Sequence, residues 1–127
     1  MKLIPFVQAG ELAFTLSASE IRRRWGAPLY EGRNGVALNE LDYGHTVLRF
    51  QDNGRLEEIT VQVPVLELDT LAVPFASLQG FVQAQDAGCF QRAGFLISPR
   101  FGLAFDPREP SWVTLLAAHG LDPWRAL

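Results

Sequence analysis

Polar and apolar positions alternate most clearly in residues 56–63. From Ile59 to Val63, every second residue is a branched apolar one and the residues between are polar. This is the pattern of a strand with one face on the core and the other in water. Residues 52–54, Asp-Asn-Gly, suit a tight hairpin because Asn and Gly accept the positive φ angles of a type I′ turn. The sequence therefore predicts that a strand at 45–50 turns back into a strand at 56–63.

Residues 17–28 predict a short helix with marked ends. Ser17 and Glu20 have the spacing of a capping box, in which each side chain bonds the backbone N–H of the other residue. Gly26 and Pro28 end the helix, since glycine allows the terminating turn and proline cannot continue it. Residues 12–16 before it are expected to form a short strand or an extended lead-in.

The second half of the chain has the same order of patterns. Residues 76–85 carry apolar side chains at helical spacing, and Gly88 follows them. Three apolar segments then follow, as three follow the first helix. The sequence predicts two degenerate units, at about 10–63 and 70–118, each with one helix and three strands. The predicted strands are 36–41, 45–50 and 56–63 in the first unit, and 94–97, 103–105 and 112–116 in the second.

Size and composition place both units in one domain spanning residues 1–127. Hydrophobic residues make up 48% of the chain and charged residues 20%, as in a globular protein. Neither unit alone has enough apolar side chains to be stable, so the two are expected to share one core. The prediction is an α+β fold in which two helices pack on an antiparallel sheet.

Arg22, Arg23 and Arg24 form the only basic run. They fall in the last turn of the predicted helix, where positive charge is favourable beside the unpaired carbonyl groups. Successive helical residues also point about 100° apart, so the three cannot form one phosphate-binding row. The net charge is −3, which argues against non-specific binding to nucleic acid or to an anionic membrane. We interpret the arginines as a helix end, with Arg22 or Arg23 open to an acidic partner.

Cysteine content and hydropathy indicate a soluble cytoplasmic protein. Cys89 is the single cysteine, so no intrachain disulfide can form, as is usual in a reducing compartment. No apolar run approaches the roughly 20 residues that a membrane-spanning helix needs.

No complete catalytic motif is present. The P-loop, G-x-G-x-x-G and G-x-S-x-G patterns are absent. His45 and His119 lack the spacing of metal ligands, so neither a metal site nor a cofactor is predicted. The enzymatic alternative is a small site built from Asp42, His45 and Cys89.

Carboxylates come in pairs around the predicted sheet, and such a surface suits a basic partner protein. A solvated face without a partner is the simpler interpretation. Trp25 and Trp112 are expected in the core, whereas Trp124 is expected to be either a core cap or an exposed anchor. The candidate partner-binding residues are Glu40, Asp42, Tyr43, Glu57, Glu58, Glu67, Asp69 and Trp124.

Residues 16–28, 48–50 and 56–60 together resemble small immunity proteins of bacterial polymorphic-toxin and contact-dependent growth inhibition systems. The shared features are a capped helix, a Gly-x-Pro stop and a following hairpin. The resemblance implies a non-enzymatic cytoplasmic protein that binds and neutralises a cognate toxin domain. Because the chain is acidic, a basic toxin such as a nuclease would suit it. Besides the enzymatic alternative, a structural or adaptor protein acting through self-association remains open. The sequence does not indicate the oligomeric state.

Overall fold

A computed structural model describes residues 1–127, and its largest element is one eight-stranded antiparallel sheet. The strands are β4 (Tyr30–Arg33), β5 (Asn39–Asp42), β6 (Thr46–Phe50), β7 (Leu56–Gln62), β10 (Phe90–Arg92), β11 (Phe95–Ser98), β12 (Leu103–Phe105) and β13 (Trp112–Leu116). Their order across the sheet is β10-β11-β12-β13-β7-β6-β5-β4. The two runs of strands therefore meet where β7 pairs with β13, and β10 and β4 are the two edges.

Helix α1 (Ala18–Trp25) has the ends that the sequence predicts. The Ser17 hydroxyl accepts from the Glu20 amide, and the Ser17 amide donates to the Glu20 carboxylate, both at 3.2 Å. Gly26 ends the helix with a φ of +76°, and the three arginines occupy the last turn. The capping box and the helix stop are thus confirmed.

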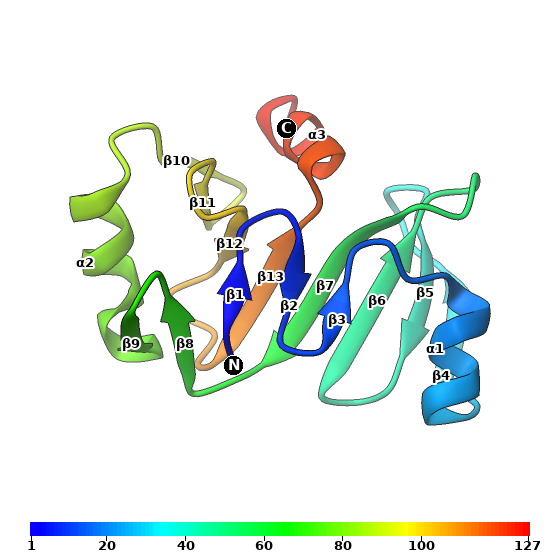
Figure 1. Cartoon of the computed structure of the whole chain (residues 1–127). Coiled ribbons are helices and arrows are strands. Elements are labelled where there is room, and N and C mark those ends of the chain that lie inside the picture. Colours follow the sequence, from blue (N-terminus) through cyan, green and yellow to red (C-terminus); the bar gives the residue numbers. More distant parts are fainter.

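Two small β-structures and three further helices surround the large sheet. The N-terminal strands and the β8–β9 hairpin are joined by the Glu67 amide, which donates to the Met1 carbonyl at 2.8 Å. In Figure 1 the strands β1–β3 pass in front of the central strands, with α1 and α2 at opposite ends. The remaining elements are β1 (Leu3–Ile4), β2 (Gln8–Ala9), β3 (Leu12–Ala13), β8 (Val65–Leu68), β9 (Leu71–Pro74), α2 (Phe75–Gln85), a 3-10 helix (Ala118–Gly120) and α3 (Leu121–Arg125).

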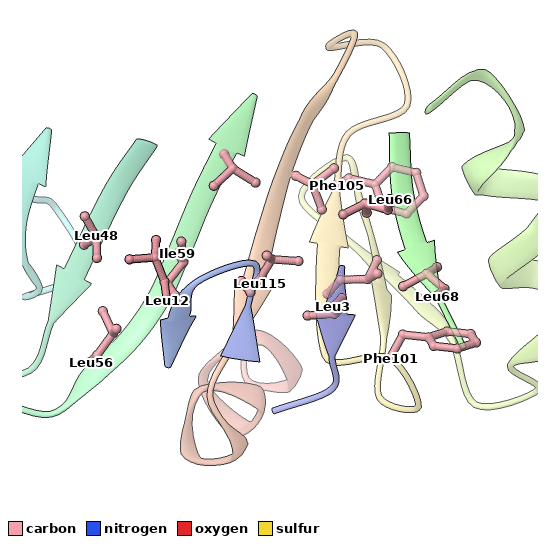
Figure 2. Packing of buried hydrophobic residues seen from close by; sticks show 14 of the residues in the cluster. Leu3, Leu12, Leu48, Leu56, Ile59, Leu66, Leu68, Phe101, Phe105 and Leu115 are labelled. Atoms are coloured by element: carbon pink, nitrogen blue, oxygen red, sulfur yellow. The ribbon is translucent and has the colours of Figure 1, made fainter. Parts of the chain in front are cut away.

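The core lies on the sheet face beneath these small strands. Leu48, Ile59 and Leu115 are neighbours across β6, β7 and β13, and all three are fully buried. Leu3 and Leu12 pack on them from the N-terminal strands (Figure 2). Each such leucine or isoleucine contributes about 1.5–3 kcal/mol through burial. Both runs of strands thus share one hydrophobic core.

The opposite face of the sheet is covered only in part. A separate cluster of Ile97, Ala104 and Leu116 is buried there, and Trp124 from α3 and Phe95 pack against it. Because side chains alternate along a strand, Glu40 on β5, Arg49 on β6, and Glu58 and Thr60 on β7 point to this same face. The C-terminal helix therefore leaves part of a sheet face exposed.

The α+β class and the antiparallel sheet are as predicted, whereas several details differ. β5 begins at Asn39 rather than at residue 36, because Asn34 accepts from the Val36 and Leu38 amides and closes a turn. The protein has three α-helices, whereas two were predicted. Strands β4 and β10 at the edges, and the β8–β9 hairpin, were not among the predicted strands.

The tryptophans expected in the core do not lie there. Trp25 is 42% exposed, because α1 packs at one end of the sheet. The Trp25 ring meets the Tyr43 ring edge-on, with their centroids 5.1 Å apart, and no further element covers it. Trp112 is half-buried. The prediction for Trp25 is wrong, because four-residue spacing identifies a helix face but not how much of the protein covers it.

Candidate functional site

A groove of about 490 Å³ lies on the exposed part of the sheet, between strands β5–β7, the turn at 34–38 and helix α3. Four carboxylates and one guanidinium line it on the side of the strands, and apolar side chains line it on the side of α3. We call it the acidic groove. A second hollow of about 320 Å³ adjoins it and shares Arg49, Phe95 and Thr114. The acidic groove is lined by Asn34, Val36, Ala37, Leu38, Glu40, Arg49, Gln51, Asp52, Glu57, Glu58, Phe95, Thr114, Pro123, Trp124 and Leu127.

Arg49 forms part of the floor of the acidic groove and is held from three sides. It pairs in register with Glu40 on β5 and with Glu58 on β7, and its guanidinium lies 3.7 Å and 3.4 Å from their carboxylates. It also donates to the Thr60 hydroxyl at 2.5 Å, and that hydroxyl lies 2.8 Å from the Thr114 hydroxyl. Cross-strand pairs of this kind fix the rotamers, so the floor is rigid and polar.

Glu58 joins the sheet to the C-terminal helix. Its carboxylate is buried and accepts from the Trp124 indole N–H at 3.0 Å, although the two residues are 66 positions apart. Burial raises the pKa of Glu58 above its ordinary value, while the Arg49 guanidinium and the Trp124 N–H act to lower it. The balance leaves a carboxylate whose charged form the folded protein disfavours, a condition often found at functional sites.

Glu57 is a buried carboxylate that makes no salt bridge. It sits where the β6–β7 register shifts by one residue, so it and Glu58 both line the groove. Its carboxylate accepts from the Gln51 amide at 2.8 Å and makes no salt bridge. Buried carboxylates are normally paired with a cation. The groove therefore holds negative charge that the chain itself does not neutralise.

Replacing Glu58 with glutamine is expected to raise the free energy of unfolding at pH 7 and to raise it less at pH 4. A carboxyl with a raised folded-state pKa stabilises the fold fully below its ordinary value of 4.5 and loses that contribution as the pH rises through the folded-state value. Urea unfolding at both pH values measures the difference, with Glu40→Gln as the matched control. An equal effect of Glu58→Gln at the two pH values would contradict the prediction.

The structure brings together half of the predicted partner-binding residues, namely Glu40, Glu57, Glu58 and Trp124 in the acidic groove. It places Asp42 and Tyr43 elsewhere. The Asp42 carboxylate accepts from the Gly44 amide at 2.8 Å, and the Tyr43 hydroxyl donates to the Gly26 carbonyl at 2.8 Å. These two residues hold a turn and the end of α1.

Glu67 and Asp69 lie on the β8–β9 hairpin, away from the groove lining. Glu67 is exposed and takes part in an isolated bridge with Lys2. Asp69 has a φ of +55° in the hairpin turn, and its carboxylate lies 3.6 Å from the Arg100 guanidinium. The predicted acidic surface thus separates into a groove on one face of the sheet and residues remote from it.

The enzymatic alternative needs Asp42, His45 and Cys89 in one place. His45 follows β5, and its ring nitrogen lies 3.4 Å from the Gln62 amide oxygen. Cys89 precedes β10, which is six strand positions from β5 across the sheet. At about 4.8 Å per strand that is roughly 29 Å, so these residues do not form one site.

Neither a metal-binding cluster nor a membrane-spanning helix is present in this chain. No group of three or more His, Cys, Asp or Glu side chains is arranged to hold a metal ion. None of the helices combines the length and the apolar character needed to cross a bilayer.

Several groove residues were missed by the sequence analysis, chiefly Arg49, Phe95 and Thr114. Arg49 and Thr114 lie on strands that were predicted, and their polar positions point to the face opposite the core. The alternation of the strands was the signal that could have found them. The alternation could not identify Phe95 as a groove residue. Phe95 lines the groove together with Trp124, whose ring centroid lies 5.2 Å from its own, and that contact depends on the tertiary fold.

No protein family, no curated protein and no solved structure matches this chain.

Proposed function

We propose that this protein is a non-enzymatic binding module, an immunity protein that captures a cognate toxin domain in the bacterial cytoplasm through the acidic groove. The observation that carries the proposal is the groove itself, in which Glu57 and Glu58 are buried beside the half-buried Trp124. Interfaces of high affinity are commonly built on an aromatic anchor surrounded by complementary charge.

The chemistry of the groove favours a basic partner. Glu57 makes no salt bridge within the chain and accepts only from the Gln51 amide, and burial already raises the pKa of Glu58. An incoming arginine or lysine would supply the missing positive charge, while its aliphatic stem would lie against the apolar wall. A nuclease is a suitable class of toxin, since its own substrate selects for a basic surface.

Charge introduced at the rim is expected to weaken toxin binding at least tenfold. Val36 and Leu127 line the groove and are 66% and 61% exposed, so Val36→Lys and Leu127→Lys should leave the fold intact. A lysine there repels a basic partner at close range. Affinity purification from the native strain identifies the partner by mass spectrometry. Calorimetry then measures its affinity, and co-expression measures protection from the toxin.

Leu71→Lys is the matched control, because Leu71 is an apolar residue on β9 that is 54% exposed and lies outside the groove. It should bind and protect as the unaltered protein does. Equal affinity in the rim variants and the control would place the interface elsewhere. Continued lethality of the toxin in the presence of the unaltered protein would remove the proposed function.

The two-unit organisation is also part of the proposal. The units at about 10–63 and 70–118 are supported by the chain order, since α1 precedes β4–β7 and α2 precedes β10–β13. Each unit then contributes four strands rather than three to the large sheet. They meet at the Thr60–Thr114 rung, where β7 and β13 pair. The groove lies next to this junction and draws residues from both units.

A further inference from the structure

We infer that two copies of this chain associate through their β4 edges, which pair antiparallel and centre on Gly32. This inference is independent of the acidic groove and of the proposed toxin partner. β4 is the last strand of the large sheet and pairs only with β5 (Figure 1). Its outer side therefore carries backbone groups that no other strand pairs with. Such an edge is a template for another strand.

The hydrogen-bonding pattern shows which residues of β4 face outward. The Asn34 amide donates to the Leu38 carbonyl at 2.9 Å, and these two residues continue the β4–β5 register. In an antiparallel pair, hydrogen-bonded positions alternate with positions that are not bonded. Gly32 and Tyr30 therefore bond to β5. The backbone groups of Glu31 and Arg33 point away from the sheet.

Only one register between two such edges matches opposite charges. Outward-facing residues must pair with outward-facing residues, so Glu31 can face Glu31, Arg33 can face Arg33, or each can face the other residue. The first two registers put like charges directly opposite one another, which is destabilising. The third is centred on Gly32 and pairs Glu31 with Arg33 of the second copy twice. The edge is self-complementary in that register.

The residue at the centre suits a close approach of two strands. With the outward pairs on either side, Gly32 would face Gly32 of the second copy in the position where Cα atoms come closest. The Tyr30 ring already lies over Gly32, where a Cβ would meet its Cζ at 2.9 Å. Two Tyr30 rings would thus flank the two-fold axis and cover both glycines.

Exposed apolar side chains beside the edge add contact area. Leu29 and Tyr30 are 81% and 60% exposed, and Trp25 is 42% exposed. The intramolecular ion pairs of Glu31 with Arg22 and of Arg33 with Asp52 lie in solvent, where such pairs contribute little. They do not prevent either side chain from meeting the second copy, because a carboxylate accepts several donors and a guanidinium has five N–H donors.

Charge-swap variants test this pairing by sedimentation velocity over a wide range of concentration. The unaltered protein is expected to sediment with twice the mass of the chain at high concentration. Glu31→Arg or Arg33→Glu alone puts like charges opposite one another twice, and each should weaken association about tenfold or more. The double variant restores both pairs and should return the dissociation constant to within about threefold of the unaltered protein.

Arg22→Gln is the matched control, since it removes the intramolecular partner of Glu31 without altering β4. It should dimerise at least as well as the unaltered protein. A strictly monomeric protein would overturn the inference, and so would a double variant no better than the single ones. Open-ended assemblies would also overturn it, because a two-fold pairing of β4 edges closes after two copies.

Discussion

Replacing Asp86 with alanine is expected to lower the free energy of unfolding by about 3 kcal/mol, mainly through lost hydrogen bonds to a charged acceptor. Asp86 ends α2 and is only 6% exposed. Its carboxylate accepts from the Ser98 hydroxyl at 2.7 Å and from the amides of Arg100 and Gly88 at 3.1 Å and 2.9 Å. One side chain thus ties the end of α2 to the turn between β11 and β12.

The cost is large because the Ser98 hydroxyl remains buried when its acceptor is removed. Ser98 is fully buried, and its oxygen also accepts from the Phe101 amide at 3.1 Å. Phe101 is itself one of the largest fully buried side chains in the core. Leaving a buried donor without an acceptor carries the full desolvation penalty of that group. The effect should therefore exceed that of an ordinary surface substitution, which stays within about 0.5 kcal/mol.

Asp86→Asn removes the negative charge and keeps the size of the side chain. The difference in the free energy of unfolding between this variant and the unaltered protein should depend on pH. Burial acts to raise the pKa of Asp86, but the hydrogen bonds from Ser98, Arg100 and Gly88 together hold it below its ordinary value of 3.8. A lowered carboxyl pKa stabilises the fold above that ordinary value and loses its contribution as the pH falls through the folded-state value.

The asparagine variant should therefore be less stable than the unaltered protein at pH 7, and the gap should narrow in acid. Guanidinium unfolding of the unaltered protein and of both variants measures this. Equal stability of the alanine variant and the unaltered protein at pH 7 would show that the contacts of Asp86 are not needed.

Local signals in the sequence predicted the parts of the fold that depend on neighbouring residues. The Ser17–Glu20 capping box and the Gly26 stop act within one helix. Residues 52–54 likewise lie in the hairpin between β6 and β7. The predicted type I′ turn is wrong, however, because Gly54 has a positive φ of +91° and Asn53 does not. In both cases the interacting groups are separated by a few positions, so the local pattern could locate the element.

The sequence did not predict the edges and junctions of the sheet, because these depend on residues that are far apart in the chain. β4 reads Tyr-Glu-Gly-Arg, with charged residues and a glycine where a strand usually has branched apolar ones. It is a strand because β5 offers it a hydrogen-bonding edge. The β8–β9 turn uses Asp69 at positive φ instead of the glycine that would have marked a hairpin. The pairing of β7 with β13 joins segments about fifty positions apart and has no local signature.

The same difference between local and long-range contacts explains which residues of the acidic groove could be predicted. Glu57, Glu58 and Glu40 could be picked from the sequence as acidic residues near predicted strands. Their separation from Asp42, Glu67 and Asp69 could not, because it depends on which face and which hairpin each occupies. Nor could the sequence indicate that the C-terminal helix would form one wall of the groove, since that helix is held by contacts with strands far away in the chain.

Replacing Trp124 with alanine is expected to lower the free energy of unfolding by about 2 kcal/mol and the affinity for the proposed toxin partner by about thirtyfold. Its ring packs on Phe95 and covers the small cluster that includes Leu116, so its loss exposes apolar surface. Its indole N–H also donates to Glu58 at 3.0 Å. The residue is half-buried, and it acts both as a cap on that cluster and as a wall of the acidic groove.

Trp124→Phe separates these two roles. Phenylalanine keeps an aromatic ring against Phe95 but donates nothing to Glu58, so most of the stability should remain while the pKa of Glu58 rises further. Thermal unfolding and calorimetry with the partner, applied to both variants, measure stability and affinity separately. If alanine lowers stability but leaves affinity unchanged, Trp124 is a core cap alone, and the partner binds without it. If both variants lose affinity while phenylalanine retains stability, the indole N–H and its carboxylate partner belong to the recognition surface, and the groove is where the toxin docks.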